Sequence, residues 1–369
     1  MKVLSLVSYN FLPAKMGGQK HIALHNLYLS KLIQLYCITT SSNNLTEAPY
    51  EVNNSISESK FRYINLFYFF KIRKIIQQEQ ITHIILEHPY WGWLGFLLQR
   101  FCKVKFMIHS HNIEAIRFKT IHKFWWKILW LYEKWVHQQA DFSLFISAED
   151  RNYAVEHYKL LPNKTDVSTY GIEQKDIPSE LEITTAKNTI RSLYSIGNEE
   201  KIILFNGTLN YQPNINALEI IVEQINLILQ NSVNFSYKIL ICGKQLPEKF
   251  NHFKTIPNII YCGLVNDIES YLKATDVFIN PVLDGGGIKT KIVEALGFNV
   301  KVVSTKSGAI GIPLKLTSSK LKIIQDNDWQ NFSKEIIAFN NTNNTPQDFF
   351  DHFYWGNIAK KSSNIIKKC

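Results

Sequence analysis

The sequence predicts an α/β protein of two domains, each a mostly parallel sheet with helices on both faces. The chain has 369 residues, more than a single compact core usually organises. Short apolar runs of strand length alternate along it with helix-length segments, which is the rhythm of parallel strands joined by helical crossovers. The polar stretch 172–187 interrupts this rhythm and predicts the linker between the domains.

The first domain is expected to span residues 1–178. Its apolar runs are bounded by polar or turn residues, and the segments between them have the length of helices. Strands are expected at 3–7, 35–39, 81–86, 106–108 and 142–146, and helices at 18–31, 67–80, 90–101, 118–139 and 148–157.

The second domain is expected to span residues 179–349, and strand and helix patterns alternate in it more regularly than in the first domain. A last helix is expected within 350–369, after a polar stretch. Strands are expected at 202–205, 237–242, 259–262, 277–280, 301–304 and 321–324, and helices at 214–229, 268–274, 288–296 and 329–339.

Composition narrows the class of protein. A hydrophobic content of 46% excludes wholesale disorder. The chain has no run of eighteen uncharged apolar residues, and its first residues are typical of a strand and not of a signal peptide, so a cytoplasmic location is expected. Its five cysteines form no CxxC pair, which favours free thiols in a reducing compartment. Between Lys60 and Lys134, thirteen Lys or Arg stand against four acidic residues, and this favours an anionic partner surface.

The most informative stretch is residues 284–296. An apolar strand runs into three glycines, and these lead into a helix that carries Lys289, Lys291 and Glu294. Glycine lets backbone N–H groups approach an anion, and a helix N-terminus adds partial positive charge. With two lysines and a carboxylate for ribose hydroxyls, the stretch predicts a site for a nucleotide diphosphate. A glycine-rich turn before a helix with solvated lysines is the simpler interpretation.

This stretch resembles the donor-binding motif of the family 4 glycosyltransferases of the GT-B fold. Residues 205–214 and 302–312 resemble two further pieces of that family's second domain, in the same order and spacing. The resemblance covers nearly the whole chain, more loosely in the first half. It implies two Rossmann-like domains facing across a cleft, with the C-terminal helix crossing back to the first domain.

The resemblance also implies roles for individual residues. Lys291 would stabilise the negative charge of the departing diphosphate, and then no bound metal is required. His111, in a His-Asn-x-Glu segment after a predicted strand, would contact the donor sugar or the leaving phosphate, and Glu114 and Asp284 would lie near the acceptor. The implied donor-binding residues are Gly17, Gly18, Gly207, Thr208, Val265, Gly285, Gly286, Gly287, Lys289, Lys291 and Glu294.

Two departures from the family pattern concern charge. Many members carry an Arg and a Lys after the first strand of the second domain, but residues 207–214 hold neither, and Lys289 and Lys291 are expected to substitute. Where the family has the first glutamate of its pair, this chain has Gly286, with Asp284 two residues away.

The predicted function is transfer of a sugar from a nucleotide-diphosphate sugar to an acceptor hydroxyl, with no further cofactor and no metal. The resemblance implies retention of anomeric configuration and a bacterial surface polysaccharide or glycolipid as product. A nucleotide-sugar epimerase of similar fold is the alternative enzyme. A basic protein that binds nucleic acid is disfavoured, because the aromatic residues lie mainly on helix faces, and no Gly-x-Gly-x-x-Gly follows a strand as a dehydrogenase needs. The triplet Asp326-Asn327-Asp328 is interpreted as a helix N-cap, with metal binding as the alternative.

The segment 118–139 combines lysines with many aromatic and aliphatic residues. Lysines recur along it at mostly three- or four-residue steps, between tryptophans and leucines. This pattern suits a peripheral contact with an anionic membrane surface. A mostly buried helix with one solvated face explains it as well.

Overall fold

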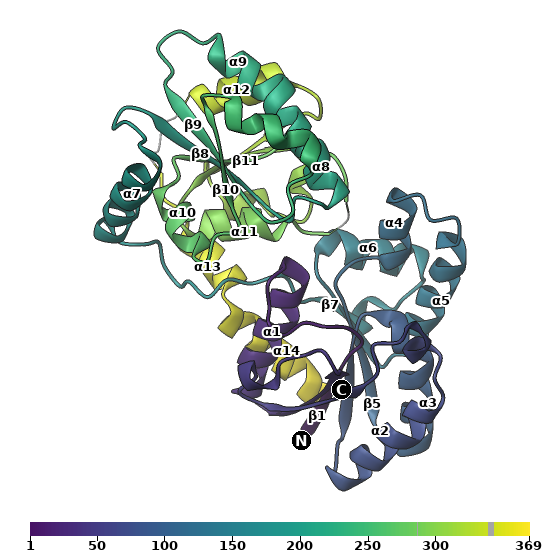
Figure 1. Ribbon diagram of the computed structural model, residues 1–369. Helices are drawn as coiled ribbons and strands as arrows, with labels where there is room; N and C mark the ends of the chain where they lie inside the picture. The colour runs from purple at the N-terminus through teal and green to yellow at the C-terminus, as the bar shows by residue number, and fades with distance from the viewer. Residues whose placement is uncertain (286, 339–342) are drawn as a thin grey trace. The chain divides into compact units, whose positions relative to one another are not determined.

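The computed structural model describes residues 1–285, 287–338 and 343–369, and the chain divides into two compact units (Figure 1). Unit 1 contains Met1–Glu173, the C-terminal residues Phe353–Cys369 and a short segment with Gly287 and Ile288. Unit 2 contains Gln174–Gly285 and Lys289–His352. The last change of unit along the chain, near residue 353, returns the C-terminus to the first unit.

Unit 1 is built on a seven-stranded sheet in the order β3-β2-β1-β4-β5-β6-β7, and each neighbouring pair is parallel. The edge strands β3 and β7 were not predicted, because β3 has the polar sequence EVNNSI and β7 has three residues. The strands are β1 Lys2–Val7, β2 Gln34–Thr40, β3 Glu51–Ile56, β4 His83–Glu87, β5 Lys105–Ser110, β6 Phe142–Phe145 and β7 Thr165–Val167.

Helices cover both faces of this sheet, because alternate strand residues point to opposite faces. Leu4, Leu6 and Ile84 pack with residues of α2, α3 and α5, whereas Val3 and Ile85 pack with residues of α1 and α14. The helices of unit 1 are α1 Gly17–Ser30, α2 Phe67–Gln78, α3 Gly92–Cys102, α4 Glu114–Thr120, α5 Trp126–Gln139, α6 Ala148–His157 and α14 Trp355–Lys368.

The single helix predicted at 118–139 is wrong. The chain forms α4 and α5 instead, with a break between Thr120 and Trp126. His122 lies in the break with a left-handed φ of 55°. A residue in that conformation cannot continue a right-handed helix. The lysines of this segment therefore form no single stripe: Lys119 lies on α4, Lys123 in the break, and Lys127 and Lys134 on α5.

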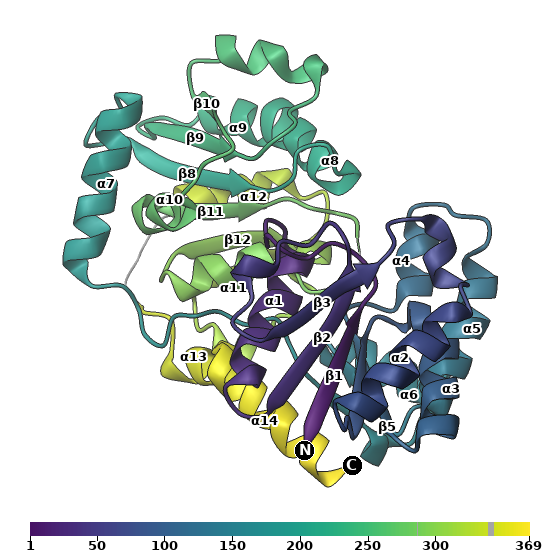
Figure 2. The same cartoon turned by 60° about the horizontal axis from the view of Figure 1, so that its bottom comes forward.

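The C-terminal helix packs on unit 1 as predicted, beside α1 (Figure 2). The predicted last helix is in fact two, α13 Gln347–Phe353 and α14, which are separated by Tyr354. Ile172 donates its N–H to the Phe353 carbonyl at 2.7 Å and accepts from the Trp355 N–H at 3.0 Å. The Trp355 indole is fully buried, so this junction holds α14 in place.

Unit 2 is built on a six-stranded parallel sheet in the order β10-β9-β8-β11-β12-β13. All six strands were predicted from their apolar runs. They are β8 Lys201–Asn206, β9 Tyr237–Cys242, β10 Ile259–Gly263, β11 Val277–Asn280, β12 Lys301–Thr305 and β13 Leu321–Ile324.

One helix of unit 2, α7, begins inside the stretch 172–187 that was predicted to be a linker and ends beyond it, at Tyr194. Its N-terminus is fixed by a capping box, in which Ser179 and Glu182 exchange hydrogen bonds with each other's backbone N–H. The helices of unit 2 are α7 Glu180–Tyr194, α8 Gln212–Ile220, α9 Asn226–Gln230 after a π-helical segment at Ile221–Ile225, α10 Ile268–Ala274, α11 Thr290–Gly297, α12 Trp329–Ile337 and all but the last residue of α13. Short 3₁₀ helices occur at Leu45–Glu47, Lys60–Tyr63, Pro89–Trp91, Pro162–Lys164, Glu248–Thr255, Ser307–Ala309 and Leu314–Leu316.

The strand orders locate the binding edge of each unit. In open parallel sheets, ligands bind beyond the carboxyl ends of the strands where the strand order reverses. The reversal lies between β1 and β4 in unit 1 and between β8 and β11 in unit 2. The loops that follow these four strands are therefore the first places to look for a functional site.

Candidate functional site

In unit 2, the side chain of Lys291 reaches the carboxyl end of β8. Lys291 lies in the first turn of α11, for which Lys289 is the N-cap residue. Its Nζ is 3.0 Å from the carbonyl oxygen of Asn206 and 3.1 Å from Oδ1 of Asn214, and it lies 4.3 Å from the centre of the Phe205 ring. A cation is thus placed at the strand end where residues 207–214 supply none.

The Lys291 side chain is close to losing its proton at neutral pH. Burial lowers the pKa of Lys291 to about 7, and the positive charge of Lys289 acts in the same direction while Glu294 opposes it. Desolvation disfavours the charged form of an amine, whereas hydrogen bonds to that form favour it. A phosphate group next to Nζ would therefore be bound together with a proton.

The glycine turn before α11 uses conformations that suit glycine. Gly285 has a φ of 92° and Gly287 a φ of 67°, both in the left-handed region. Gly286 lies outside the described residues. Lys289 donates from Nζ to the Gly285 carbonyl at 2.7 Å, and Asp284 is exposed and accepts a hydrogen bond from Asn216 at 3.3 Å.

The structure brings some of the predicted donor residues together and leaves one apart. Gly207 and Thr208 follow β8 directly, in the same loop region that Lys291 reaches. Glu294 is half-buried, one turn further along α11. Val265 follows β10, which is separated from β8 by β9, and it takes no part in these contacts.

Unit 1 contains a pocket of about 630 Å³ whose lining includes three predicted residues, Gly18, His111 and Glu114. Gly17 and Gly18 open α1, as predicted. Aromatic rings supply most of the remaining wall, and Arg117 adds a positive charge. The other lining residues are Tyr9, Tyr63, His88, Tyr90, Asn112, Phe118, Trp125, Leu129 and Tyr132.

His111 belongs to a buried histidine cluster, which we define as His21, His25, His88, His109 and His111. The Glu87 carboxylate anchors two of its members, because Oε2 is 2.7 Å from Nε2 of His111 and 3.0 Å from Nδ1 of His109. Nε2 of His21 is 3.2 Å from Nε2 of His109.

Three histidines of the cluster, His21, His25 and His111, have lowered pKa values. Burial lowers the pKa of His111 and of His25 to about 3, and neighbouring imidazoles add to the effect. The pKa of His21 is well below its usual value for the same reasons. Burial alone would raise the pKa of Glu87, but His109 and His111 outweigh it and hold this pKa well below the usual range.

The sequence reasoning missed Glu87, His21 and His25. The available signal was the four-residue spacing of His21 and His25, which places both on one face of α1, and the two-residue spacing of His109 and His111, which places both on one face of a strand. Among the described residues, the groups of His, Cys, Asp and Glu close enough to share a metal ion are His21–His109–His111 and His25–Glu87–His109. The Asp326-Asn327-Asp328 triplet is not among them: Asp328 caps α12 as predicted, and Asp326 accepts from Ser307.

Glu114 is buried, and side chains of the pocket hold its carboxylate. Arg117 binds it with Nη2 at 2.6 Å and Nε at 2.8 Å, the Tyr90 hydroxyl donates to it at 2.7 Å, and Nδ1 of His88 is 3.2 Å away. Burial would raise the pKa of Glu114, but His88 and Arg117 hold it far below the usual range. Glu114 therefore fixes the wall of the pocket around Arg117 and Tyr90.

A third buried carboxylate, Glu133 of α5, caps α4. It accepts the backbone N–H groups of Glu114 at 3.0 Å and Ala115 at 2.9 Å, and the hydroxyl of Tyr158 at 3.0 Å. Burial raises the pKa of Glu133 to about 8, with help from the charge of Glu114. Sequence reasoning gave this glutamate no role, because its partners are 18 to 25 residues away along the chain.

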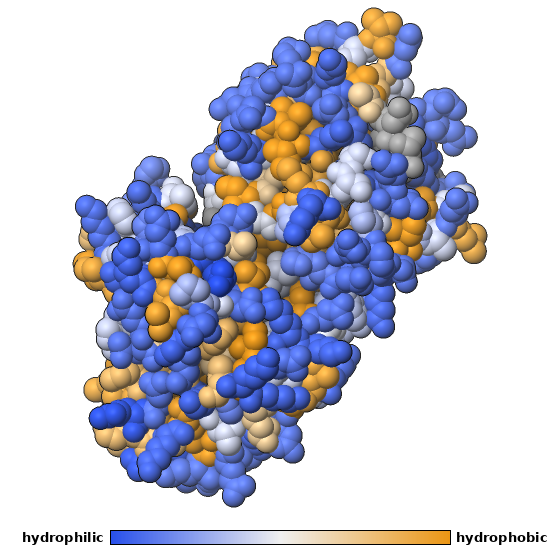
Figure 3. Space-filling view, turned by 180° about the vertical axis from the view of Figure 1, so that it is seen from behind, coloured by the Kyte–Doolittle hydropathy of each residue, from blue (hydrophilic) through white to orange (hydrophobic). Residues whose placement is uncertain are grey.

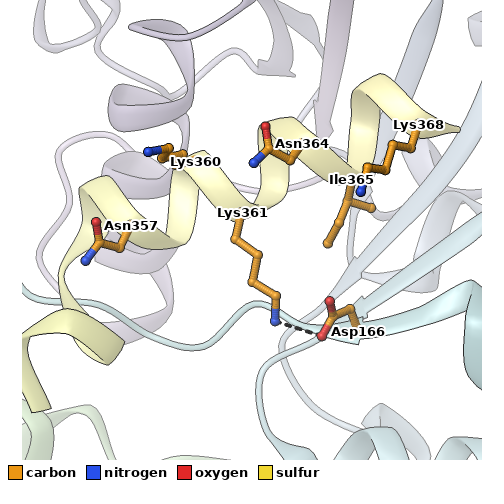
Figure 4. Close-up of a pocket in the computed structure, with 7 residues that line it drawn as sticks. All are labelled: Asp166, Asn357, Lys360, Lys361, Asn364, Ile365 and Lys368. Carbon is orange, nitrogen blue, oxygen red and sulfur yellow. Dashed lines mark hydrogen bonds and ion pairs between the residues drawn. The ribbon is translucent and has the colours of Figure 1, made fainter. Parts of the chain in front are cut away.

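A groove of about 400 Å³ runs along α14 (Figure 4). Lys360, Lys361 and Lys368 line it, and Nζ of Lys361 is 2.7 Å from the carboxylate of Asp166. None of the predicted site residues lines this groove. It is therefore a basic surface feature, separate in its residues from the pocket that His111 lines.

The surface of unit 1 exposes large apolar side chains. Phe124 is 91% exposed, and Ile128 and Leu131 of α5 are also exposed. Around α2 and α3, Phe61, Ile64, Leu66, Phe67, Phe70 and Phe101 are exposed as well. Figure 3 shows apolar side chains between hydrophilic ones on one face of the molecule. Within the described part of the chain, we find no helix with the length and apolar character needed to span a bilayer.

Comparison with known proteins agrees with this architecture. A sequence model described as "Glycosyl transferases group 1" matches residues 200–340, and one described as "Glycosyltransferase Family 4" matches residues 17–174. An uncharacterized glycosyltransferase of Methanocaldococcus jannaschii is 22% identical over 296 residues, which are 74% of this chain and 72% of that protein.

Two solved structures are similar over the whole chain. A glycosyltransferase from Rickettsia africae has a TM-score of 0.75 at 14% identity, over 100% of this chain and 98% of that one. Anabaena HepE in complex with UDP has a TM-score of 0.75 at 13% identity, over 100% of both chains. The predicted fold class, with two Rossmann-like domains of the GT-B type, is confirmed.

Each sheet carries candidate residues where its strand order reverses. Together with these matches, this arrangement defines a glycosyltransferase. The chain belongs to the family 4 glycosyltransferases, the glycosyl transferases group 1.

Proposed function

We propose that this glycosyltransferase moves a hexose from a nucleoside-diphosphate sugar to an acceptor hydroxyl with retention of anomeric configuration. The observation that carries the proposal is the position of Lys291, whose Nζ lies 3.0 Å from the carbonyl at the end of β8, beside the N-terminus of α11. Cleavage of a sugar–diphosphate bond develops negative charge on the departing oxygens, and a cation placed there in advance stabilises it.

On the donor side, the α11 N-terminus and the two lysines hold the diphosphate. Gly285 and Gly287 let the backbone approach it, and Lys289 and Lys291 supply the positive charge that a divalent cation would otherwise provide. Glu294, one turn further along α11, accepts the ribose hydroxyls. Because Anabaena HepE was solved with UDP, a uridine nucleotide is the first donor to test.

On the acceptor side, the pocket of unit 1 receives a sugar. Its wall of tyrosine, phenylalanine and tryptophan rings offers apolar faces, and Arg117 and Asn112 offer hydrogen-bond donors. Gly18 and His111, which line the same pocket, contact the transferred sugar in this proposal. The acceptor is a growing bacterial surface polysaccharide or a glycolipid.

Donor binding is tested by thermal unfolding in the presence of UDP, GDP and ADP. We expect one of them to raise Tm, and we expect Glu294→Gln to lose most of this shift. Glu223→Gln removes an exposed charge of the same unit and should keep it. If no nucleotide shifts Tm in the natural sequence, the donor site is wrong. Turnover with the matching nucleotide sugar, followed by NMR of the new anomeric centre, tests retention.

We also propose that unit 1 contacts the cytoplasmic face of an anionic membrane. The support is the exposure of Phe124, Ile128 and Leu131 beside lysines, with Lys119 and Lys127 stacked on the Trp126 ring at 4.9 and 5.8 Å. Apolar side chains in the interface and lysines near anionic headgroups act together in such contacts.

Vesicle flotation tests this contact. The protein should float with vesicles of phosphatidylcholine and phosphatidylglycerol but not with phosphatidylcholine alone, and the double change Phe124→Ser and Ile128→Ser should weaken flotation. Leu181→Ser, which removes a similarly exposed side chain from unit 2, is the control. Equal flotation of the two variants would contradict a role for α5 and its preceding turn.

A further inference from the structure

The Lys291 ammonium contacts two oxygen atoms and one aromatic ring, all from unit 2. The oxygens are the Asn206 carbonyl at 3.0 Å and Oδ1 of Asn214 at 3.1 Å, and the ring is that of Phe205. The carbonyl and the ring come from β8 itself, so only the contact with Asn214 depends on a polar side chain. It is therefore the contact that a single substitution can remove.

Asn214 is fixed so that its oxygen faces the lysine. It is 8% exposed and lies in the first turn of α8, where its N–H donates to the Tyr211 carbonyl at 2.9 Å. Its Nδ2 donates to the Thr208 carbonyl at 2.9 Å, so Oδ1 is the end of the amide that meets Nζ of Lys291. A Cβ at Gly207 would lie 2.7 Å from this Nδ2, so the glycine leaves room for the amide.

The charges around Lys291 make its protonation sensitive to the hydrogen bond with Asn214. The ammonium meets neutral oxygens from β8 and α8, while the charged groups that act on it, Lys289 and Glu294, oppose each other. Burial has already lowered the pKa of Lys291 to about 7. Gain or loss of one hydrogen bond to the ammonium therefore changes the fraction of Lys291 that is charged at neutral pH.

We infer that Asn214 is a positioning residue that holds the Lys291 ammonium at the carboxyl end of β8, ready for the diphosphate of the donor. The inference rests on the proposed function for its purpose, but the contact itself can be tested without a nucleotide. Asn214 acts through Lys291 and need not touch the substrate.

Two substitutions at this position should act in opposite directions. Asn214→Leu keeps the size of the side chain and removes the acceptor, so the proton affinity of Lys291 should fall about tenfold, the usual value of one hydrogen bond to a charged group. Asn214→Asp places a negative charge beside Nζ and should raise that affinity by a similar factor or more. Asn231→Asp makes the same chemical change at an exposed position of unit 2 and should have no effect.

The readout without nucleotide is the pH midpoint of acetylation of Lys291, measured by brief exposure to acetic anhydride and mass spectrometry. An unprotonated amine reacts, so the midpoint should move down by about one pH unit in Asn214→Leu and up in Asn214→Asp. A general loosening of the fold would move both variants in the same direction. Midpoints that stay unchanged, or move together, overturn the inference.

The second readout is the affinity for UDP, GDP and ADP by calorimetry at pH 6 and pH 8. For a nucleotide that binds the natural sequence, Asn214→Leu should weaken binding about tenfold at pH 8 but only about twofold at pH 6, where about half of the lysine in the variant still carries its proton. Equal losses at both pH values overturn the inference. If none of the nucleotides binds the natural sequence, the proposed function fails, while the acetylation midpoints still decide the role of Asn214.

Discussion

Acidification from pH 7 to pH 5.5 should destabilise unit 1, because it contains several buried imidazoles that are neutral when the protein is folded. His25, His111 and His137 have pKa values lowered to about 3 by burial, and the pKa of His21 is well below its usual value. An unfolded histidine takes up a proton near pH 6.5. Below that pH the unfolded chain binds protons that the folded chain does not, so stability falls as the pH falls.

The magnitude follows from these shifts. Between pH 7 and 5.5, each such histidine loses slightly more than about 1 kcal/mol of stabilisation, so the four together lose about 5 kcal/mol. Glu133 acts in the opposite direction, because its pKa is raised to about 8 and the folded state then holds a proton that the unfolded glutamate has released. This restores about 2 kcal/mol over the same interval. The net loss is about 3 kcal/mol, a large part of the stability of a typical domain.

The assay is urea unfolding at the two pH values, followed by tryptophan fluorescence. Seven of the eight tryptophans belong to unit 1, and Trp329 is the one in unit 2. Changing Trp329 to Phe makes the signal a report on unit 1. The free energy of unfolding at each pH comes from the midpoint and the slope of the transition.

Two variants separate the opposing contributions. Glu133→Gln removes the group that gains stability in acid, so its loss between pH 7 and 5.5 should grow to about 5 kcal/mol. His137→Asn should reduce the loss by about 1 kcal/mol, whereas His157→Gln, at an exposed histidine of the same unit, should not change it. Equal or greater stability at pH 5.5 than at pH 7 in the natural sequence would refute the reasoning.

Three further predictions follow from single contacts. The affinity for the bound nucleotide should fall as the pH rises from 7 to 9, because Lys291 loses its proton, and in Lys291→Met it should be weaker and nearly independent of pH in calorimetric titrations. Gly92→Ala should destabilise unit 1 by about 1–3 kcal/mol in urea unfolding, since its Cβ would lie 2.0 Å from a methyl group of Val136, and adding Val136→Ala should recover part of that loss. Ser179→Ala should cost about 1 kcal/mol in unit 2 by removing the cap of α7, with a smaller helical signal in circular dichroism near the unfolding midpoint as the check.

The alternation of strands and helices was predictable because each buried strand of a parallel sheet leaves an apolar run in the sequence. The strands of unit 2 are fully or largely buried, and their runs were found within one or two residues. The edge strand β3 left no such run, because polar side chains such as Asn53 and Asn54 are tolerated where one side of a strand has no neighbour. The break at His122 also left no signal, since neither proline nor glycine stands there.

The site was predictable in its residue types and less so in its connections. The glycines and lysines before α11 stand together in the sequence, so local chemistry pointed to them. The partners of Lys291 are 77 and 85 residues away, and only the pairing of β8 with β11 brings them near. The same holds for Glu87, which reaches His111 because β4 pairs with β5. Such contacts depend on strand order, which no local pattern records.

Burial sets a pH limit in each unit, on the acid side for the stability of unit 1 and on the alkaline side for the charge of Lys291 in unit 2. Burial removes the charge from a cationic side chain, so the folded chain binds fewer protons than the unfolded chain wherever a histidine or lysine is enclosed. For the histidine cluster this limits stability on the acid side, below the pKa of an unfolded histidine. For Lys291 it limits the charge available to a diphosphate on the alkaline side, above about pH 7. A ligand that brings negative charge to Nζ would raise the pKa of Lys291 again. The pH above which Lys291 loses its charge should therefore move upward on binding. The pH below which unit 1 loses stability depends on its histidines and should not change.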